Sequence, residues 1–387
     1  MFDVLVIGCG LCGMVVAREL ADRNIKVHII EKRNHIGGNI FDYIDKNGIL
    51  VQKYGPHVFF TDNPEIEKYV TRFVPIDYFY AECRTYINGM AIPIPFNFAS
   101  IDMIYDVEKA GLLKKYLKRE FGEKEIVSVV DIINSNVSVI HEYGMFIYEH
   151  EYRKYSAKQW GMPIEKIDSS IFMRVPVYLS YFRPYTRQKY QYMPQGGFTN
   201  FAHRLINHKN ISFELDTEAL IKIKIDINEN KILFEGKEAD FPVVYTGPLD
   251  ELFEYNYGKL PYRSLEFVWK TVSKENILET PLSAFPEGDK YTRITDYTQF
   301  PLQKLDGKSV IAIEFPVEYD KDSFCGNEPY YPVLTQDSKT MFSMYEVLAK
   351  KFRGLYPCGR LADFKYYNMD AVIERAWNVA ETVIKNI

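Results

Sequence analysis

A glycine-rich turn between two apolar runs restricts the possible fold more than any other feature of the sequence. Residues 4–7 form a continuous apolar run, as expected of a parallel strand that is buried on both faces. The motif GCGLCG follows at residues 8–13, residues 14–20 have helical periodicity, and a second apolar run leads to Glu31. Strand, glycine turn, helix, strand and terminal acid together predict a βαβ unit of the dinucleotide-binding type.

Each residue of this turn has a physical role. Gly8 allows the tight turn, Gly10 lets the backbone approach a pyrophosphate, and Gly13 lets the helix pack closely on the strand. The helix begins near Leu11, so its free backbone N–H groups point at the anion. Glu31 suits a ribose diol and would repel a 2′-phosphate.

The same turn contains Cys9 and Cys12, a C-x-x-C pair that could be a redox dithiol or half of a metal site. The chain has 5 cysteines and no second pair at metal-ligand spacing. We therefore interpret both thiols as small residues that fill tight space, and we predict no metal site. The odd number of cysteines argues against a disulfide framework and favours a reducing compartment.

The composition and the lengths of the apolar runs argue against nucleic acid and membrane as binding partners. The 47 Lys and Arg residues nearly balance the 52 Asp and Glu residues, which argues against a nucleic-acid-binding protein. No apolar run approaches the ~20 residues that span a bilayer, and no basic leader is evident. We expect a cytoplasmic protein with no membrane partner. The 30 Tyr and 26 Phe residues supply many flat binding surfaces.

The 387 residues exceed what one compact core needs, and periodicity predicts three interleaved units. Helical periodicity dominates an insert, whereas short alternating runs such as YTRITDY predict an antiparallel sheet. The expected fold class is α/β: a Rossmann-like dinucleotide-binding domain with a helical insert and an antiparallel β-sheet domain. The predicted boundaries are 1–78, 195–250 and 340–387 for the first domain, 97–165 for the insert, and 79–96, 166–194 and 251–339 for the sheet domain.

Motifs along nearly the whole chain resemble those of the bacterial UDP-galactopyranose mutases, flavoenzymes that contract the ring of a sugar nucleotide. In family order they are GCGLCG, EKRNHIGGN, KYGPHVF, IPFNF, KQWG, RVPV, P-x-GG-F-T, YTGP, YRSL, YTRI, EPYYP and CGRLADFKYYNMD. The resemblance implies an isomerase that uses FAD in its reduced form. N5 of the flavin would attack C1 of the sugar and expel the nucleotide diphosphate, after which the sugar's 4-hydroxyl would reclose the ring without net oxidation.

The resemblance also implies which residues bind FAD. Those that match the adenosine-diphosphate side are Gly8, Gly10, Leu11, Cys12, Gly13, Glu31, Lys32, Arg33, Gly38 and Asn39. Those that match the isoalloxazine side or its surroundings are His57, Thr246, Gly247, Gly359, Arg360, Tyr367, Asn368 and Met369. A helix that begins near Met369 would favour an anionic reduced flavin, and the sequence pattern predicts Asn368 as its N-cap.

On the substrate side, Arg174 and Arg293 match arginines that would hold the diphosphate, because guanidinium groups bind oxyanions bidentately. Tyr155 and Trp160 match the aromatic pair around the uridine. The other implied substrate residues are Tyr190, Tyr330, Tyr331, Tyr367 and Phe60, and the implied catalytic residues are Arg174, Arg293 and His57. From residue chemistry alone, a structural core histidine and ordinary salt bridges of the arginines remain open alternatives.

The sequence departs from the family pattern mainly near the sugar and the nucleotide. Phe60 replaces a second histidine, Glu151 replaces an aromatic ring four residues before Tyr155, and Phe364 and Asn368 replace a Tyr and an Asp. We expect Phe60 and Phe364 to make the sugar pocket less polar. The leading substrate is UDP-galactopyranose, converted to UDP-galactofuranose for cell-surface polysaccharide.

Several alternatives stay open. The same reaction could act on another sugar nucleotide, such as dTDP-fucopyranose. Less favoured alternatives are an FAD-dependent amine oxidase or desaturase and a non-catalytic binder of nucleotide sugars. We further expect a reductant such as NAD(P)H and a homodimer.

Overall fold

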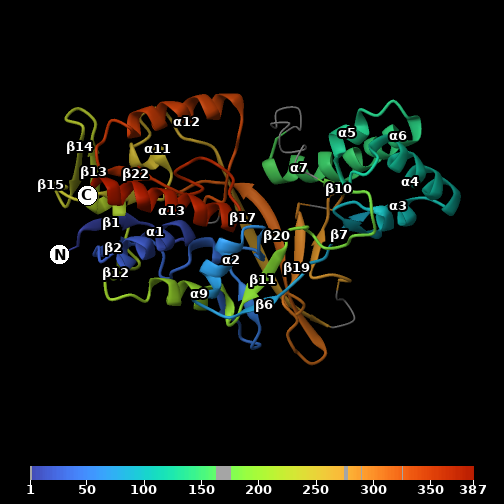
Figure 1. Cartoon of the computed structure of the whole chain (residues 1–387), viewed down its shortest axis with the longest axis horizontal. Helices are drawn as coiled ribbons and strands as arrows, with labels where there is room; N and C mark the ends of the chain where they lie inside the picture. Colours follow the sequence, from blue (N-terminus) through green and yellow to red (C-terminus); the bar gives the residue numbers. More distant parts are fainter. Residues whose placement is uncertain (1, 163–175, 274–277, 289, 325) are drawn as a thin grey trace.

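The computed structural model describes residues 2–162, 176–273, 278–288, 290–324 and 326–387. The N-terminal and C-terminal segments, blue and red in Figure 1, lie together at one end of the molecule. A group of helices lies at the other end, and the orange strands of a large sheet lie between them (Figure 1). The predicted fold class is confirmed: a Rossmann-like domain, a helical insert and a largely antiparallel sheet.

A five-stranded parallel sheet forms the centre of the Rossmann-like domain. Its order is β12 (Ile211–Glu214), β2 (Val27–Ile30), β1 (Val4–Ile7), β16 (Val243–Tyr245) and β22 (Leu355–Pro357). Every neighbouring pair is parallel. The central strand β1 is buried at all its positions, which explains why its sequence is uniformly apolar.

Helices cover both faces of this sheet. On one face lie α1 (Leu11–Asp22), α9 (Gly197–Ile206) and α13 (Met369–Asn386), whose apolar sides join Val4, Val6 and Val244 in one core. On the other face lie α11 (Leu249–Leu252) and α12 (Gln336–Ala349), which form a second core with Leu5 and Val243. Alternate side chains of one strand thus serve two cores.

The large sheet has seven strands. Its order is β21 (Tyr331–Pro332), β17 (Tyr262–Ser273), β20 (Lys308–Glu318), β19 (Arg293–Asp296), β18 (Leu282–Ala284), β7 (Cys83–Ile87) and β8 (Met90–Ile94). The predicted antiparallel pairing holds except between β18 and β7, which are parallel. The β7–β8 hairpin comes from a distant part of the chain, so no short turn forces an antiparallel pairing onto β18.

The register of this sheet gathers polar side chains on one face. Residues directly opposite each other on neighbouring strands project from the same face. Arg263 stands opposite Tyr331, and Arg293 stands opposite Glu314. These four side chains, together with Thr85 of β7, belong to one face of the sheet.

The helical insert has its own core. It contains α3 (Phe98–Ile104), α4 (Val107–Phe121), α5 (Val129–Ile133), α6 (Ser138–Ile147), the π-helical turn η2 (Tyr148–Tyr152) and α7 (Arg153–Trp160). A two-stranded sheet of β9 (Ile126–Ser128) and β10 (Pro176–Tyr178) accompanies it. Asn97 and Ser128 form capping boxes that fix the starts of α3 and α5. Helix α6 ends at Ile147, and the chain continues through the π-helical turn η2 directly into α7.

Smaller elements complete the fold. They are η1 (Gly38–Ile40), β3 (Asp42–Ile44), β4 (Leu50–Gln52), β5 (Phe59–Thr61), α2 (Pro64–Thr71), β6 (Ile76–Tyr78), β11 (Tyr190–Pro194), α10 (Ala219–Lys222), β13 (Ile223–Asp226), β14 (Lys231–Phe234) and β15 (Lys237–Glu238). The side chain of Asn63 accepts a hydrogen bond from the Glu65 N–H and caps the start of α2. Among the described residues, no helix is both long enough and apolar enough to cross a membrane.

Candidate active site

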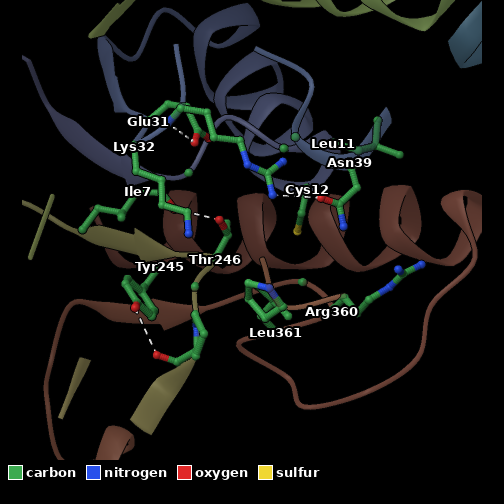
Figure 2. Close-up of a pocket in the computed structure, with 18 of the residues that line it drawn as sticks. Ile7, Leu11, Cys12, Glu31, Lys32, Asn39, Tyr245, Thr246, Arg360 and Leu361 are labelled. Carbon is green, nitrogen blue, oxygen red and sulfur yellow. Dashed lines mark hydrogen bonds between the residues drawn. The ribbon is translucent and has the colours of Figure 1, made fainter. Parts of the chain in front are cut away.

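A cleft opens at the carboxyl ends of β1, β2 and β16, where α/β sheets bind their ligands. It encloses about 1270 Å³ of space, solvent included. Figure 2 shows Glu31, Cys12 and Asn39 on one side of the cleft and Thr246 and Arg360 on the other. All predicted cofactor residues line this cleft except Gly13 and Asn368.

The glycine turn forms the floor of the cleft. A Cβ on Gly13 would lie 2.1 Å from the carbonyl oxygen of Gly8, so close packing of α1 on β1 requires glycine there. A Cβ on Gly10 would meet no atom nearer than 4.0 Å, which leaves open space for a ligand. Gly10 is also the N-cap of α1 and has no side chain to bond the first-turn N–H groups. These N–H groups remain available to an anion.

Glu31 closes the far side of the same turn. One of its carboxylate oxygens accepts a hydrogen bond from the Cys9 N–H at 2.6 Å, and the other accepts one from the Arg33 N–H at 2.9 Å. Each oxygen keeps a further lone pair. Glu31 is buried at the edge of the cleft, so a ribose diol is a fitting donor for it.

The two cysteines of the C-x-x-C motif do not pair with each other. The Cys12 sulfur instead approaches the Cys358 sulfur, at 2.7 Å, and this contact raises the pKa of Cys12. Burial raises the pKa of Cys9 to about 12. No cluster of possible metal ligands occurs among the described residues.

Arg33 joins the cofactor cleft to the loop before β21. Its guanidinium donates to both carboxylate oxygens of Glu328, with Nε at 3.2 Å and Nη2 at 2.5 Å. Nη2 also donates to the Asn39 side-chain oxygen at 3.0 Å, and the guanidinium lies 4.4 Å from the centre of the Tyr54 ring. Lys32 lies 3.6 Å from the same Glu328 carboxylate.

His57 stands where the cofactor cleft approaches the large sheet. Its Nδ1–H donates to the Gly55 carbonyl at 2.9 Å, so Nε2 is the acceptor nitrogen. Burial, and then the charges of Arg360 and Arg293, lower its pKa to about 4. The imidazole is therefore neutral at pH 7.

The second part of the site lies on the polar face of the large sheet. Arg293 Nη2 contacts the Glu314 carboxylate at 2.5 Å. Burial lowers the pKa of Arg293, but Glu314, Tyr155 and Tyr331 raise it well above its ordinary value. These neighbours come from β20, α7 and β21, so three elements converge on one guanidinium.

Aromatic rings lie near the guanidinium groups of Arg293 and Arg360. Trp160 at the end of α7 meets Tyr331 edge to face, with 6.5 Å between ring centres. The Arg360 guanidinium lies 5.5 Å from the Tyr331 ring centre and 5.0 Å from that of Tyr366. Arg360 also donates to the Tyr367 carbonyl at 2.8 Å. Arg360 thus links the cofactor cleft with the aromatic part of the site.

Arg174 falls outside the described residues. Three more of the predicted substrate residues belong to other elements. Phe60 and Tyr190 belong to the three-stranded sheet of β5, β11 and β6. The Tyr330 ring is buried in a small cluster with Tyr54 and Leu265.

One of the remaining expectations is confirmed and one needs correction. Asn368 occupies the predicted N-cap position of α13, although its side chain makes no capping hydrogen bond and the Ala371 N–H bonds to the Asp370 side chain. Phe364 does not border the sugar side. Its ring is buried in the core behind the parallel sheet, where it stacks on Phe342 with 5.3 Å between ring centres.

Sequence reasoning missed Glu314, Tyr366 and Tyr185. Glu314 lies 21 positions from Arg293, and only the strand register brings them together. Tyr366 stacks on Tyr331 with 5.9 Å between ring centres. Tyr185 is exposed in part, but desolvation of its hydroxyl end raises its pKa to about 12. Tyr366 and Arg293 also influence this pKa. The adjacent tyrosines of KYYNM were the available signal for Tyr366.

The fold and the cleft define a dinucleotide-binding protein of the Rossmann-like class. A family model described as UDP-galactopyranose mutase matches residues 150–366, and one described as NAD(P)-binding Rossmann-like domain matches residues 6–73. The chain belongs to the UDP-galactopyranose mutase family, whose members are isomerases. Membership of this family indicates a flavin cofactor.

Individual relatives agree with this assignment. The UDP-galactopyranose mutase of Mycoplasma pneumoniae is 30% identical over 99% of this chain and 96% of its own length. The dTDP-fucopyranose mutase of Escherichia coli is 32% identical over 100% of this chain and 99% of its own length. A solved structure of a reduced UDP-galactopyranose mutase covers 100% of this chain and 96% of its own, with a TM-score of 0.74 and 16% identity.

Proposed function

We propose that this chain interconverts the pyranose and furanose forms of a sugar nucleotide, with UDP-galactopyranose as the leading substrate and reduced FAD as the cofactor. One observation carries the proposal: His57 and Arg360 border the dinucleotide cleft and also lie near the second part of the site. The charge of Arg293 acts on His57, and the guanidinium of Arg360 lies against the Tyr331 ring. A bound dinucleotide and a bound sugar diphosphate would therefore meet at these two residues.

The residues present fit FAD. Two helices, α1 and α13, begin at the cleft without a side-chain hydrogen bond from the N-cap residue. The first-turn N–H groups of α1, and those of Met369 and Asp370 in α13, are available to anionic parts of the cofactor. Glu31 would accept from the adenosine ribose, and the open space over Gly10 would admit the pyrophosphate. When bound and reduced, the flavin supplies N5 as the nucleophile for C1 of the sugar.

The protein residues would hold the departing nucleotide and keep the site in one protonation state. Arg293 keeps Nη1 free of the Glu314 contact and would bind a diphosphate oxygen, with Arg174 as its predicted partner. Neutral His57 would present Nε2 as an acceptor toward the cofactor or a sugar hydroxyl. Tyr155 and Trp160 would stack on the nucleobase, which is worth roughly 1–3 kcal/mol.

A second candidate substrate is dTDP-fucopyranose, a 6-deoxy sugar nucleotide. Phe60 supports it, because a phenyl ring gives no hydrogen bond to the 6-hydroxyl of galactose. The relative that acts on dTDP-fucopyranose by its name is as similar to this chain as those named for UDP-galactopyranose. Membership of a mutase family disfavours the amine oxidase and desaturase alternatives.

The test is a product assay with the FAD-loaded, dithionite-reduced protein. UDP-galactopyranose and dTDP-fucopyranose are each incubated to equilibrium, and pyranose and furanose forms are separated by chromatography. We expect a furanose product from UDP-galactopyranose. A furanose product from dTDP-fucopyranose alone would move the assignment to the second candidate. No furanose product from either would contradict the proposal.

A further inference from the structure

Arg263, in the YRSL motif, contacts two walls of the proposed substrate site. Its backbone stands opposite Tyr331 of β21, and its carbonyl accepts a hydrogen bond from the Tyr330 N–H at 2.9 Å. Its side chain reaches the last turn of α7, where Nε donates to the Gln159 carbonyl at 3.0 Å and Nη2 to the Lys158 carbonyl at 3.5 Å. Arg263 thus contacts β21, the strand that carries Tyr331, through its backbone. It contacts α7, the helix that carries Trp160, through its guanidinium.

The end of α7 is shaped to receive this guanidinium. Gly161 ends the helix in the left-handed conformation, with φ of 65°. A Cβ at Gly161 would lie 2.6 Å from Arg263 Nη1 and 2.9 Å from its Cζ. The left-handed backbone conformation therefore favours glycine, and a Cβ at this position would displace the guanidinium. A cation at a helix C-terminus is also favoured by the helix dipole.

The guanidinium is committed to the helix rather than to a carboxylate. Among the residues that the structure describes, Arg263 forms no ion pair at all. A planar fork is suited to neighbouring carbonyls on one helix end, and a lysine would reach one of them at a time.

The contact matters because of what lies on this turn of α7. Trp160 stands between Gln159 and Gly161, and its ring meets the Tyr331 ring. The Gln159 side-chain oxygen is buried and has no hydrogen-bond partner within the described parts of the chain. A buried acceptor without a donor is costly, and the N3–H of a pyrimidine base would satisfy it.

We infer that Arg263 is a positioning residue that holds α7 against β21 and so sets the affinity for the nucleobase end of the substrate. This inference rests on the proposed function, because it takes Trp160 and Tyr331 as walls of the nucleotide site. Arg263 needs no contact with the substrate. Its loss should weaken nucleotide binding and leave the chemical step and the flavin unchanged.

The test compares three variants with wild-type holoenzyme. Arg263→Met removes both hydrogen bonds, Arg263→Lys keeps one, and Gly161→Ala crowds the guanidinium. Arg18→Lys is the matched control, because Arg18 also donates to a helix carbonyl, that of Leu205 at 3.2 Å, but lies in the Rossmann-like domain. The affinity for UDP is measured by calorimetry, and KM and kcat are measured with UDP-galactopyranose.

We expect the Kd for UDP and the KM to rise about tenfold in Arg263→Met, which corresponds to about 1.4 kcal/mol. Gly161→Ala should behave similarly, and Arg263→Lys should lie between Met and wild type. In all three, kcat and the flavin spectrum should stay near wild type, and Arg18→Lys should change neither Kd nor KM. A merely structural role would lower the melting temperature without this graded change in Kd.

The outcomes separate the inference from the proposed function. Unchanged UDP affinity in a folded, FAD-loaded Arg263→Met protein would overturn the inference and leave the proposed function standing. A graded loss of UDP affinity, with no furanose product from either UDP-galactopyranose or dTDP-fucopyranose in wild type, would support the inference and contradict the proposed reaction. Failure of the wild-type protein to bind either UDP or dTDP would overturn both.

Discussion

Arg293 of β19 stands directly opposite Glu314 of β20, and its Nη2 lies 2.5 Å from the Glu314 carboxylate. Glu314 is almost fully buried, so this carboxylate depends on the arginine for its stabilisation. Glu314 orients the guanidinium by accepting hydrogen bonds from Nε and Nη2, and Nη1 stays free of this contact. Arg293 thus stabilises the buried Glu314 carboxylate and is also proposed to bind the diphosphate. Variants can separate these two roles.

We expect Arg293→Ala to lose activity and stability together. The loss of a charged contact to the diphosphate should raise the activation barrier by roughly 2–5 kcal/mol. The unpaired Glu314 should also lower the melting temperature. The double variant Arg293→Ala/Glu314→Gln should recover the melting temperature without recovering activity. If the double variant regains turnover, Arg293 does not bind the diphosphate. Arg174→Ala should lose activity to a similar degree.

Two glycines of the first turn should fail in different ways. Gly13→Ala places a Cβ 2.1 Å from the Gly8 carbonyl oxygen, so the protein should lose stability with or without cofactor. Gly10→Ala has room in the free protein and should fold, but its methyl group would occupy the space proposed for the pyrophosphate. The flavin-to-protein absorbance ratio and the melting temperature of the apoprotein distinguish them. Full FAD content in Gly10→Ala would argue against this placement of the pyrophosphate.

Glu151 should make stability depend on pH. Burial raises its pKa to about 7, against contributions from Thr85 and Lys158 that lower it. Because the folded pKa lies above the unfolded one, the stabilisation is complete below the unfolded pKa and is lost as pH rises through about 7. Relative to Glu151→Gln, wild type should lose up to roughly 3 kcal/mol of unfolding free energy between about pH 5 and 9.

Denaturant unfolding at several pH values measures this difference. Glu149→Gln is the matched control, since Glu149 lies on the same π-helical turn, is exposed and pairs with Arg153. Parallel pH curves for wild type and Glu151→Gln would contradict the prediction.

Phe60→His should shift substrate preference toward UDP-galactopyranose relative to dTDP-fucopyranose. An imidazole at this position can bond a sugar hydroxyl, whereas a phenyl ring would leave it unpaired at a cost of roughly 1–3 kcal/mol. Phe60 lies opposite Gln191 on β11. The ratio of the two kcat/KM values is compared in both proteins. An unchanged ratio would move the search to Lys189, because Tyr192 is buried and stacks on Phe59.

The sequence was sufficient for features that depend on neighbouring residues. The β1–α1–β2 unit follows from apolar runs and glycine spacing, and the start of α2 follows from Asn63 and Pro64. Both are local, and so is the positioning of Glu31 at the end of a strand. The predicted cofactor residues lie together because parallel strands bring their carboxyl ends to one edge of the sheet.

Features that depend on distant pairing could not be predicted. The parallel contact of β18 with β7 and the register that pairs Arg293 with Glu314 are set by packing across the sheet. The Cys12–Cys358 contact spans 346 positions. The expectation for Phe364 was wrong because its sequence neighbours are predicted site residues, while its own ring is buried in the core behind the sheet.

The redox requirement tests the central claim most directly. The FAD-loaded protein is assayed with UDP-galactopyranose in its oxidised state under air and after reduction with dithionite under nitrogen. The flavin is also released by heat and identified, and we expect FAD held without a covalent bond. If a reduced flavin acts as nucleophile without net oxidation, the oxidised protein should be nearly inactive, and the reduced protein should form many equivalents of furanose product per equivalent of dithionite. Equal turnover in air without reductant, or one equivalent of reductant consumed per product, would contradict the account.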